Sequence, residues 1–132
     1  MKYMLDTNIC IHVIKNKPET AIRNFLTHQP DDLCISAITL AELLHGVEKS
    51  KFRDRNRLAV SMFLSGIAVL DFDSIAAQAY GELRADLEQN GTPIGPMNML
   101  IAGHAKSRGL ILVTNNTGEF TRVKGLQLED WS

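Results

Sequence analysis

The hydrophobic positions along the chain form two patterns, short continuous apolar runs and longer stretches in which apolar residues recur every three or four positions. Continuous runs are typical of strands buried on both faces of a sheet, and the longer period is typical of amphipathic helices. The runs that predict strands are 3–5, 33–35, 67–70 and 110–114, with a further short strand near 126–128. The stretches that predict helices are 9–17, 18–26, 36–50, 54–64, 74–90 and 96–107.

Strands and helices alternate along the whole chain. This alternation favours parallel pairing, because a helical crossover returns the chain to the same edge of the sheet before the next strand begins. Pro18 and Pro96 each suit the first turn of a helix, and the turn-rich segment 91–96 separates the last two helices. We therefore expect a three-layer α/β/α fold with a central, mainly parallel sheet, built as a single domain over residues 1–132.

Composition adds that the chain is an ordinary globular protein, since 45% of its residues are hydrophobic and 22% are charged. No apolar run approaches the roughly 18 residues that span a bilayer, and an acid at position 6 interrupts any signal peptide. Cys10 and Cys34 lack the spacing of a disulfide framework or a zinc site. We expect a cytoplasmic protein with free thiols and no membrane partner.

Net charge bears on nucleic-acid binding. The 14 basic and 15 acidic residues give a formal charge of −1, whereas proteins that grip nucleic acid by bulk electrostatics are usually basic. Contact with RNA or DNA would therefore depend on a local basic patch.

Polar residues follow two of the predicted strands at the point where each strand ends. Asp6 comes directly after 3–5, and Asn115 and Asn116 come directly after 110–114. Ligands of open parallel sheets bind at the carboxyl ends of the strands, so these side chains converge if the two strands are neighbours. For Asp6, capping of the helix that follows is an equally good interpretation.

Two further acids and one amide extend the candidate set. Glu42 lies at the border of an apolar stripe, but with Thr39 it also fits a helix capping box. Asn98 lies in the first turn of the helix that Pro96 opens, and Glu119 follows a strand by a few residues. The alternative for Glu119 is a solvated loop carboxylate.

These candidates share oxygen donors and include no His or Cys. Such a set suits Mg²⁺, with Mn²⁺ as a substitute, and a hard cation of this kind can assist hydrolysis of a phosphodiester. The four histidines have no metal-ligand spacing, and we expect His104 to be a hydrogen-bonded packing residue.

Four segments, in their order along the chain, resemble the successive motifs of PIN domains, and the whole chain resembles the VapC toxins of type II toxin–antitoxin systems. The segments are 4–8, 35–43, 95–105 and 113–116. The resemblance implies a Mg²⁺-dependent endoribonuclease whose substrate is tRNA, in particular the anticodon stem-loop of initiator tRNA. It also implies a VapB-type antitoxin partner and a homodimer, with higher toxin–antitoxin assembly.

The resemblance also implies roles for individual positions. Asp6 and Glu42 match the first two acids of the family's metal site, and Asn98 stands where the family has its third acid, normally Asp. Asn116 matches a fourth position, for which Glu119 would compensate. Of these, Asp6 and Asn98 are the expected metal ligands. Supporting positions are Thr7, Thr114 and Asn115.

Asn98 is the main departure from the family pattern. An amide keeps the shape of the carboxylate but removes its charge, so we expect weaker metal binding and impaired catalysis.

The alternative function is a non-catalytic module with the same fold that retains antitoxin or RNA binding. An aspartyl-phosphate enzyme or a receiver domain would also place an acid after the first strand. The enzyme, however, needs an Asp two residues later, where this chain has Asn8. The receiver needs a Lys after a late strand, where this chain has Asn115 and Asn116.

A basic run between two predicted helices is the candidate contact for the RNA backbone, with a solvated helix connection as the alternative. Aromatic residues make up 6% of the chain, which is sparse for a stacking platform. The candidate RNA contacts are Lys49, Lys51, Arg53, Arg55, Arg57 and Arg84.

A groove between the helical stretches 9–14 and 22–26 is the expected antitoxin site, unless these apolar faces are buried in the core or in a dimer.

Overall fold

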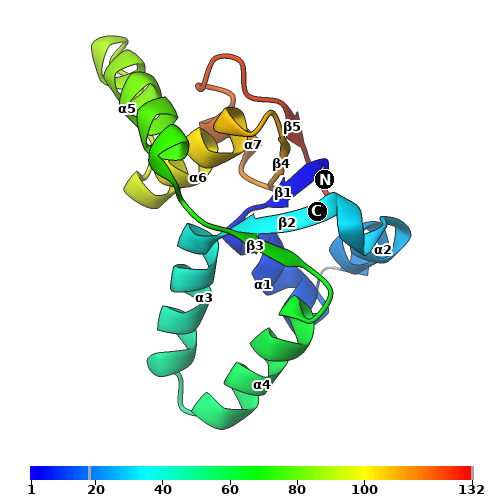
Figure 1. Ribbon diagram of the computed structural model, residues 1–132. Coiled ribbons are helices and arrows are strands. Elements are labelled where there is room, and N and C mark those ends of the chain that lie inside the picture. Colours follow the sequence, from blue (N-terminus) through cyan, green and yellow to red (C-terminus); the bar gives the residue numbers. More distant parts are fainter. Residues whose placement is uncertain (18, 132) are drawn as a thin grey trace.

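A parallel sheet forms the centre of the molecule (Figure 1). The computed structural model describes residues 1–17 and 19–131, and within them the sheet has five strands in the order β3-β2-β1-β4-β5. Every neighbouring pair is parallel, and β1 therefore lies between β2 and β4. The predicted α/β fold is confirmed. The strands are β1 (Tyr3–Leu5), β2 (Leu33–Ser36), β3 (Ala68–Leu70), β4 (Ile111–Val113) and β5 (Leu128–Glu129).

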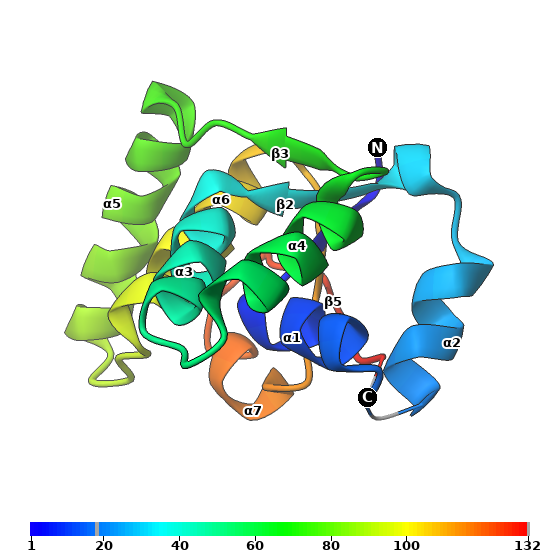
Figure 2. The same ribbon diagram turned by 90° about the horizontal axis from the view of Figure 1, so that it is seen from below.

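Helices connect the strands and cover both faces of the sheet (Figures 1 and 2). They follow the predicted stretches to within a few residues. Two short elements were not predicted, the 3-10 helix η1 (Pro30–Asp32) and α7 (Thr117–Phe120), because neither is long enough to show a helical period. The predicted start of the second helix at Pro18 lies outside the described residues. The longer helices are α1 (Thr7–Lys15), α2 (Glu19–Thr27), α3 (Ala37–Glu48), α4 (Arg53–Leu64), α5 (Ser74–Gln89) and α6 (Pro96–Ser107).

The core has two parts, one on each face of the sheet. Successive residues of a strand point to opposite faces, so Leu5 packs with residues of α1, α3 and α4, whereas Met4 packs with residues of α5 and α6. Both side chains are fully buried. This burial on both faces explains why β1, β2 and β4 are continuous apolar runs in the sequence, whereas the edge strand β3 is largely exposed.

Helices α5 and α6 approach each other closely at Gly103. A β-carbon added there would lie 2.9 Å from the backbone nitrogen and α-carbon of Tyr80. The absence of a side chain at this position therefore sets how near α6 comes to α5. Because α6 carries Asn98 in its first turn, this packing also fixes the position of one candidate site residue.

Candidate active site

Asp6 is the first residue after β1 and is almost completely buried, with an exposed fraction of 3%. Its Oδ1 accepts a hydrogen bond of 2.9 Å from the backbone N–H of Ile9, so Asp6 caps α1. Its own N–H donates to the carbonyl of Val113 in β4. The capping interpretation is therefore confirmed, and it places the Asp6 carboxylate at the carboxyl end of the central strand.

Burial raises the pKa of Asp6 from 3.8 to about 6. Hydrogen bonds from Thr114 and from the N–H of Ile9 oppose this shift, and the negative charge of Glu42 adds to it. Near neutral pH the carboxylate is thus mostly ionised in a place where solvation is poor. A cation beside it would relieve that unfavourable state.

Glu42 faces the start of α1. Its Oε1 accepts a hydrogen bond of 2.5 Å from the hydroxyl of Thr7, which also lies 3.4 Å from the hydroxyl of Thr39. The capping-box interpretation of Glu42 is wrong, because α3 begins at Ala37 with Ser36 as its cap. Thr39 therefore lies inside the helix, and Glu42 is brought next to the residue that follows Asp6.

Glu119 lies in α7 and is held by three donors. Its Oε1 accepts from the N–H of Gly95 at 2.5 Å and from Nδ2 of Asn98 at 3.2 Å, and its Oε2 accepts from Nδ2 of Asn116 at 2.9 Å. The Gly95 bond, followed by those of Asn116 and Asn98, holds the pKa of Glu119 below its usual value. The interpretation as a solvated loop carboxylate is therefore wrong.

Thr114 links Asp6 to the residues that surround Glu119. It directly follows β4, and its hydroxyl accepts a hydrogen bond of 2.9 Å from the N–H of Asn116 while it also bonds to Asp6. Asp6, Asn98, Asn116 and Glu119 thus belong to one hydrogen-bonded network at the carboxyl edge of the sheet. Glu42 lies beside this network, close enough for its charge to raise the pKa of Asp6. Within the described residues the exposed side chain of Asn115 takes no part in the network.

The donor set fits a hard cation that keeps several waters. Among the described residues, no three His, Cys, Asp or Glu side chains are grouped closely enough to hold a metal by themselves. The oxygens on offer are the carboxylates of Asp6 and Glu42, together with amide oxygens. Mg²⁺ accepts such a set, because it is usually bound through one or two carboxylates and retains water.

Sequence reasoning missed two members of the network. The N–H of Gly95 binds Glu119, and the hydroxyl of Thr39 lies next to Thr7. A backbone donor leaves no signal in the residue type, although a Gly followed by Pro at a helix start indicated an N-terminus. The expectation for His104 is confirmed, since it is buried and its Nδ1 lies 2.8 Å from the hydroxyl of Ser36.

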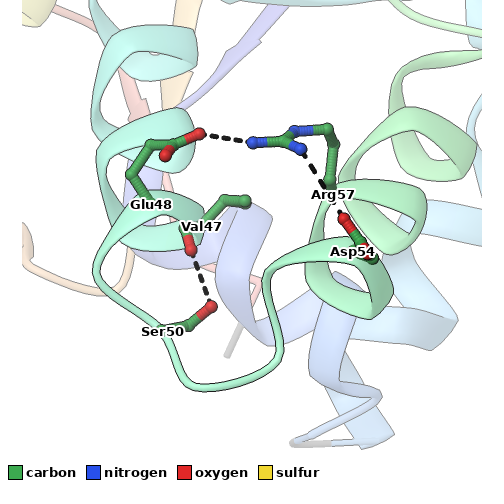
Figure 3. A network of polar contacts seen from close by, with 5 residues as sticks. All are labelled: Val47, Glu48, Ser50, Asp54 and Arg57. Carbon is green, nitrogen blue, oxygen red and sulfur yellow. Dashed lines mark hydrogen bonds and ion pairs between the residues drawn. The ribbon is translucent and has the colours of Figure 1, made fainter.

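The candidate RNA contacts differ in whether an acid already binds them. Arg57 forms an ion pair with Glu48 across the α3–α4 turn and another with Asp54 of its own helix (Figure 3). Arg84 bonds to the hydroxyl of Tyr80 at 2.7 Å and pairs with an acid of its own helix. The others are exposed, and the described residues form no ion pair with them; they are Lys49, Lys51, Arg53 and Arg55.

An apolar groove of about 570 Å³ lies beside α1 and α2, where the sequence predicted one. Ile14 of α1 and Phe25 and Leu26 of α2 line it as expected. Its other wall was not predicted and comes from α4, including Met62 and Phe63. Leu26 and Met62 are largely exposed, so the groove presents apolar surface to the outside.

Throughout residues 1–17 and 19–131, no helix combines the length and the apolar character needed to cross a bilayer.

Comparison with known proteins gives consistent results. The PIN domain family matches residues 3–126. A tRNA(fMet)-specific endonuclease VapC from Shigella flexneri is 54% identical over 132 residues, which cover 100% of this chain and 99% of that protein. A protein of the same name from Salmonella typhimurium is 52% identical over 131 residues, 99% of this chain and 98% of its own length.

Solved structures agree with these sequence matches. A chain in a crystal structure of DNA-bound VapBC from Salmonella typhimurium superposes with a TM-score of 0.95 at 52% identity, covering 100% of this chain and 99% of that one. VapBC2 from Rickettsia felis, bound to a DNA fragment from its promoter, gives a TM-score of 0.93 at 42% identity with full coverage of both chains.

Proposed function

The chain belongs to the PIN-domain family, in its VapC branch, and on this premise we propose that it is a metal-dependent endoribonuclease toxin. The relatives are named as ribonucleases or endonucleases, and the solved neighbours are VapBC complexes. The observation that carries the proposal is the convergence of Asp6, Glu42 and the Glu119 network at one edge of the sheet. Residues far apart in the sequence are joined there by hydrogen bonds.

Mg²⁺ is the proposed cofactor, with Mn²⁺ as a substitute. Asp6 and Glu42 would hold it, together with the amide oxygen of Asn98, since the amide nitrogen is already bound to Glu119. When bound, the ion would polarise the RNA phosphate and activate water. The proposal is supported by the raised pKa of Asp6, which a cation would bring back towards the ordinary range.

The chain's own residues orient the carboxylates. Thr7 donates to Oε1 of Glu42, which leaves Oε2 free to bind the cation or to accept a proton from the attacking water. Thr114 bonds to Asp6 and, through Asn116, fixes the segment that carries Glu119. A carboxylate held in one orientation loses less entropy when it binds a metal, so these bonds prepare the site.

Initiator tRNA is the proposed substrate, because two relatives more than half identical to this chain are named for that tRNA. The test incubates the purified chain with initiator tRNA and, as a control, with elongator methionine tRNA. We expect cleavage of the initiator only, dependent on Mg²⁺ or Mn²⁺, abolished by EDTA and absent in Asp6→Asn. Equal cleavage by wild type and Asp6→Asn would contradict the proposal.

Asn98 is proposed to lower activity relative to a chain with Asp at that position. The amide supplies an oxygen but no charge, so Mg²⁺ should bind less tightly. Calorimetric titration of Mg²⁺ into the wild type and Asn98→Asp compares the two directly. Equal affinity and equal cleavage would refute impairment, whereas binding of partners with no cleavage in either form would favour a non-catalytic module.

The apolar groove between α1, α2 and α4 is the proposed site for a VapB-type antitoxin. Its exposed Leu26 and Met62 suit the apolar face of a partner segment. We expect Leu26→Lys to prevent co-purification with the cognate antitoxin and to leave RNA cleavage unchanged. Full retention of the antitoxin would place its binding site elsewhere. The proposed homodimer is tested by sedimentation of the chain alone.

A further inference from the structure

The turn between α3 and α4 presents an aromatic ring among positive charges. We call this surface the α3–α4 patch; it consists of Lys49, Lys51, Phe52, Arg53 and Arg55. Phe52 is 59% exposed, and no other aromatic residue that the structure describes is exposed to this degree. An exposed aromatic ring among cations offers a flat face on which a nucleic-acid base can stack.

The cations of the patch are available to a ligand. Arg55 lies with its guanidinium carbon 4.7 Å from the centre of the Phe52 ring, and no described acid pairs with it. Arg57, two residues further along α4, is held between Glu48 and Asp54 (Figure 3). The same short segment therefore contains arginines of both kinds, one free and one already neutralised.

The patch is continuous with the candidate active site. A hollow beside the site is lined by Thr7, Glu42 and Lys49, among others. A second hollow shares Glu42 and Lys49 and extends to Ser50, and a third runs over residues 50–55. The three hollows share lining residues, so they form a series that runs from Glu42 along α3 to Phe52.

We propose that the α3–α4 patch binds the single-stranded part of the RNA substrate, with Phe52 stacked on an unpaired base and the free cations on neighbouring phosphates. The inference rests on the proposed function. Unpaired RNA offers both groups that the patch needs, because each nucleotide carries a base with a flat face and a phosphate with a negative charge. An acidic peptide would satisfy the cations and leave the ring exposed.

Continuity with the hollow at Glu42 favours RNA over an anionic membrane. A membrane surface would make no use of the adjoining hollows, whereas the patch lies at the end of a series of hollows that begins at Glu42. A polynucleotide whose scissile phosphate lies at Asp6 and Glu42 must continue over one of the adjacent surfaces. The patch is the adjacent surface that has both charge and an exposed ring.

Stacking is tested by oligouridylate binding in EDTA, which prevents cleavage. Phe52→Leu keeps an apolar side chain but removes the aromatic face, and we expect it to weaken binding roughly tenfold. Phe52→Tyr keeps the ring and should bind as tightly as the wild type. An abasic oligonucleotide of the same length should bind both variants and the wild type equally weakly. Equal affinity of Phe52→Leu and the wild type for oligouridylate would overturn the proposal.

Phosphate contacts are tested by salt dependence with a matched arginine pair. For single-stranded RNA, the negative slope of log K against log salt should become shallower by about 0.7 in Arg55→Gln, because one phosphate contact is lost. Arg57→Gln removes the same charge from the same helix but a cation that acids already bind, so its slope should stay unchanged. Equal slopes for the two variants would overturn the assignment.

Two outcomes separate this inference from the proposed function. If the wild type cleaves RNA in Mg²⁺ while Phe52→Leu binds and cleaves normally, the inference fails alone. If the wild type neither binds nor cleaves RNA, both fail. Vesicles of phosphatidylglycerol provide the membrane control: loss of vesicle binding in Phe52→Leu with oligouridylate binding intact would assign the patch to a lipid surface instead.

Discussion

Replacement of Asp6 by Asn should stabilise the metal-free protein while it abolishes catalysis. Asn keeps an oxygen that can accept the N–H of Ile9, and Asn and Asp cap helices about equally well. What the substitution removes is the negative charge, which in the wild type is buried at the end of β1. The expected effect therefore isolates the unfavourable burial of that charge from the favourable cap.

The magnitude follows from the pKa of Asp6, which burial raises from 3.8 to about 6. A raised acid pKa means that the folded protein binds the proton more tightly than the unfolded chain does. The favourable contribution of Asp6 is then complete below pH 3.8 and is lost as the pH rises through about 6. A shift of about 2 units corresponds to about 3 kcal/mol near neutral pH, which is the upper bound of the expected stabilisation.

Urea unfolding in EDTA at a series of pH values measures this effect. Asp6→Asn should exceed the wild type by about 1–3 kcal/mol near pH 7, and the difference should vanish towards pH 4. Asp6→Ala, which also loses the cap, should fall below Asp6→Asn by about 1 kcal/mol at every pH. A difference between Asp6→Asn and the wild type that is independent of pH, or a loss of stability near neutrality, would refute the reasoning.

Three further predictions concern the neighbouring elements. Asn98→Asp should bind Mg²⁺ more tightly, as measured by calorimetry, and should cleave RNA faster. In EDTA its free energy of unfolding, measured in urea, should be about 1–4 kcal/mol lower, because two carboxylates then meet where the amide now donates to Glu119 at 3.2 Å. Glu119→Gln should be less stable than the wild type at neutral pH. Because the pKa of Glu119 is lowered in the folded wild type, this difference in stability should shrink as the pH falls below 4.5, and melting temperatures at several pH values measure it. Gly103→Ala should cost about 1–3 kcal/mol because its new methyl group meets the Tyr80 backbone, whereas Gly81→Ala in open space on α5 should gain up to about 1 kcal/mol; equal melting temperatures would contradict the packing argument.

The fold was predictable from the sequence because its three inner strands, β2, β1 and β4, are short apolar runs buried on both faces. Three residues of β1, all apolar, were enough to mark a strand when followed by Asp6 and a helical period. Parallel pairing followed from the alternation of strands and helices. The cap of α3 was less certain. The predicted stretch 36–50 offered Thr39 as a second candidate through the capping-box pattern, whereas the buried hydroxyl of Ser36 caps the helix, which begins at Ala37.

The site was predictable as a set of residues but not as a network. The positions after β1 and β4 identified Asp6 and Asn116, since polar residues at strand ends of a parallel sheet converge. Two features depend on distances in space and leave no local pattern. These are the bond from Gly95 to Glu119 and the neutralisation of Arg57 by Glu48, which is nine residues away. Exposed charge in the sequence does not reveal which cations are free.

The central claim is that two carboxylates, that of Asp6 directly after β1 and that of Glu42 in α3, hold one divalent cation against an RNA phosphate. Anomalous scattering from Mn²⁺ in crystals of the chain tests this most directly. The account predicts a peak in contact with the carboxylates of Asp6 and Glu42, and its loss in Asp6→Asn. A fully loaded crystal whose only Mn²⁺ peaks lie away from both carboxylates would contradict it.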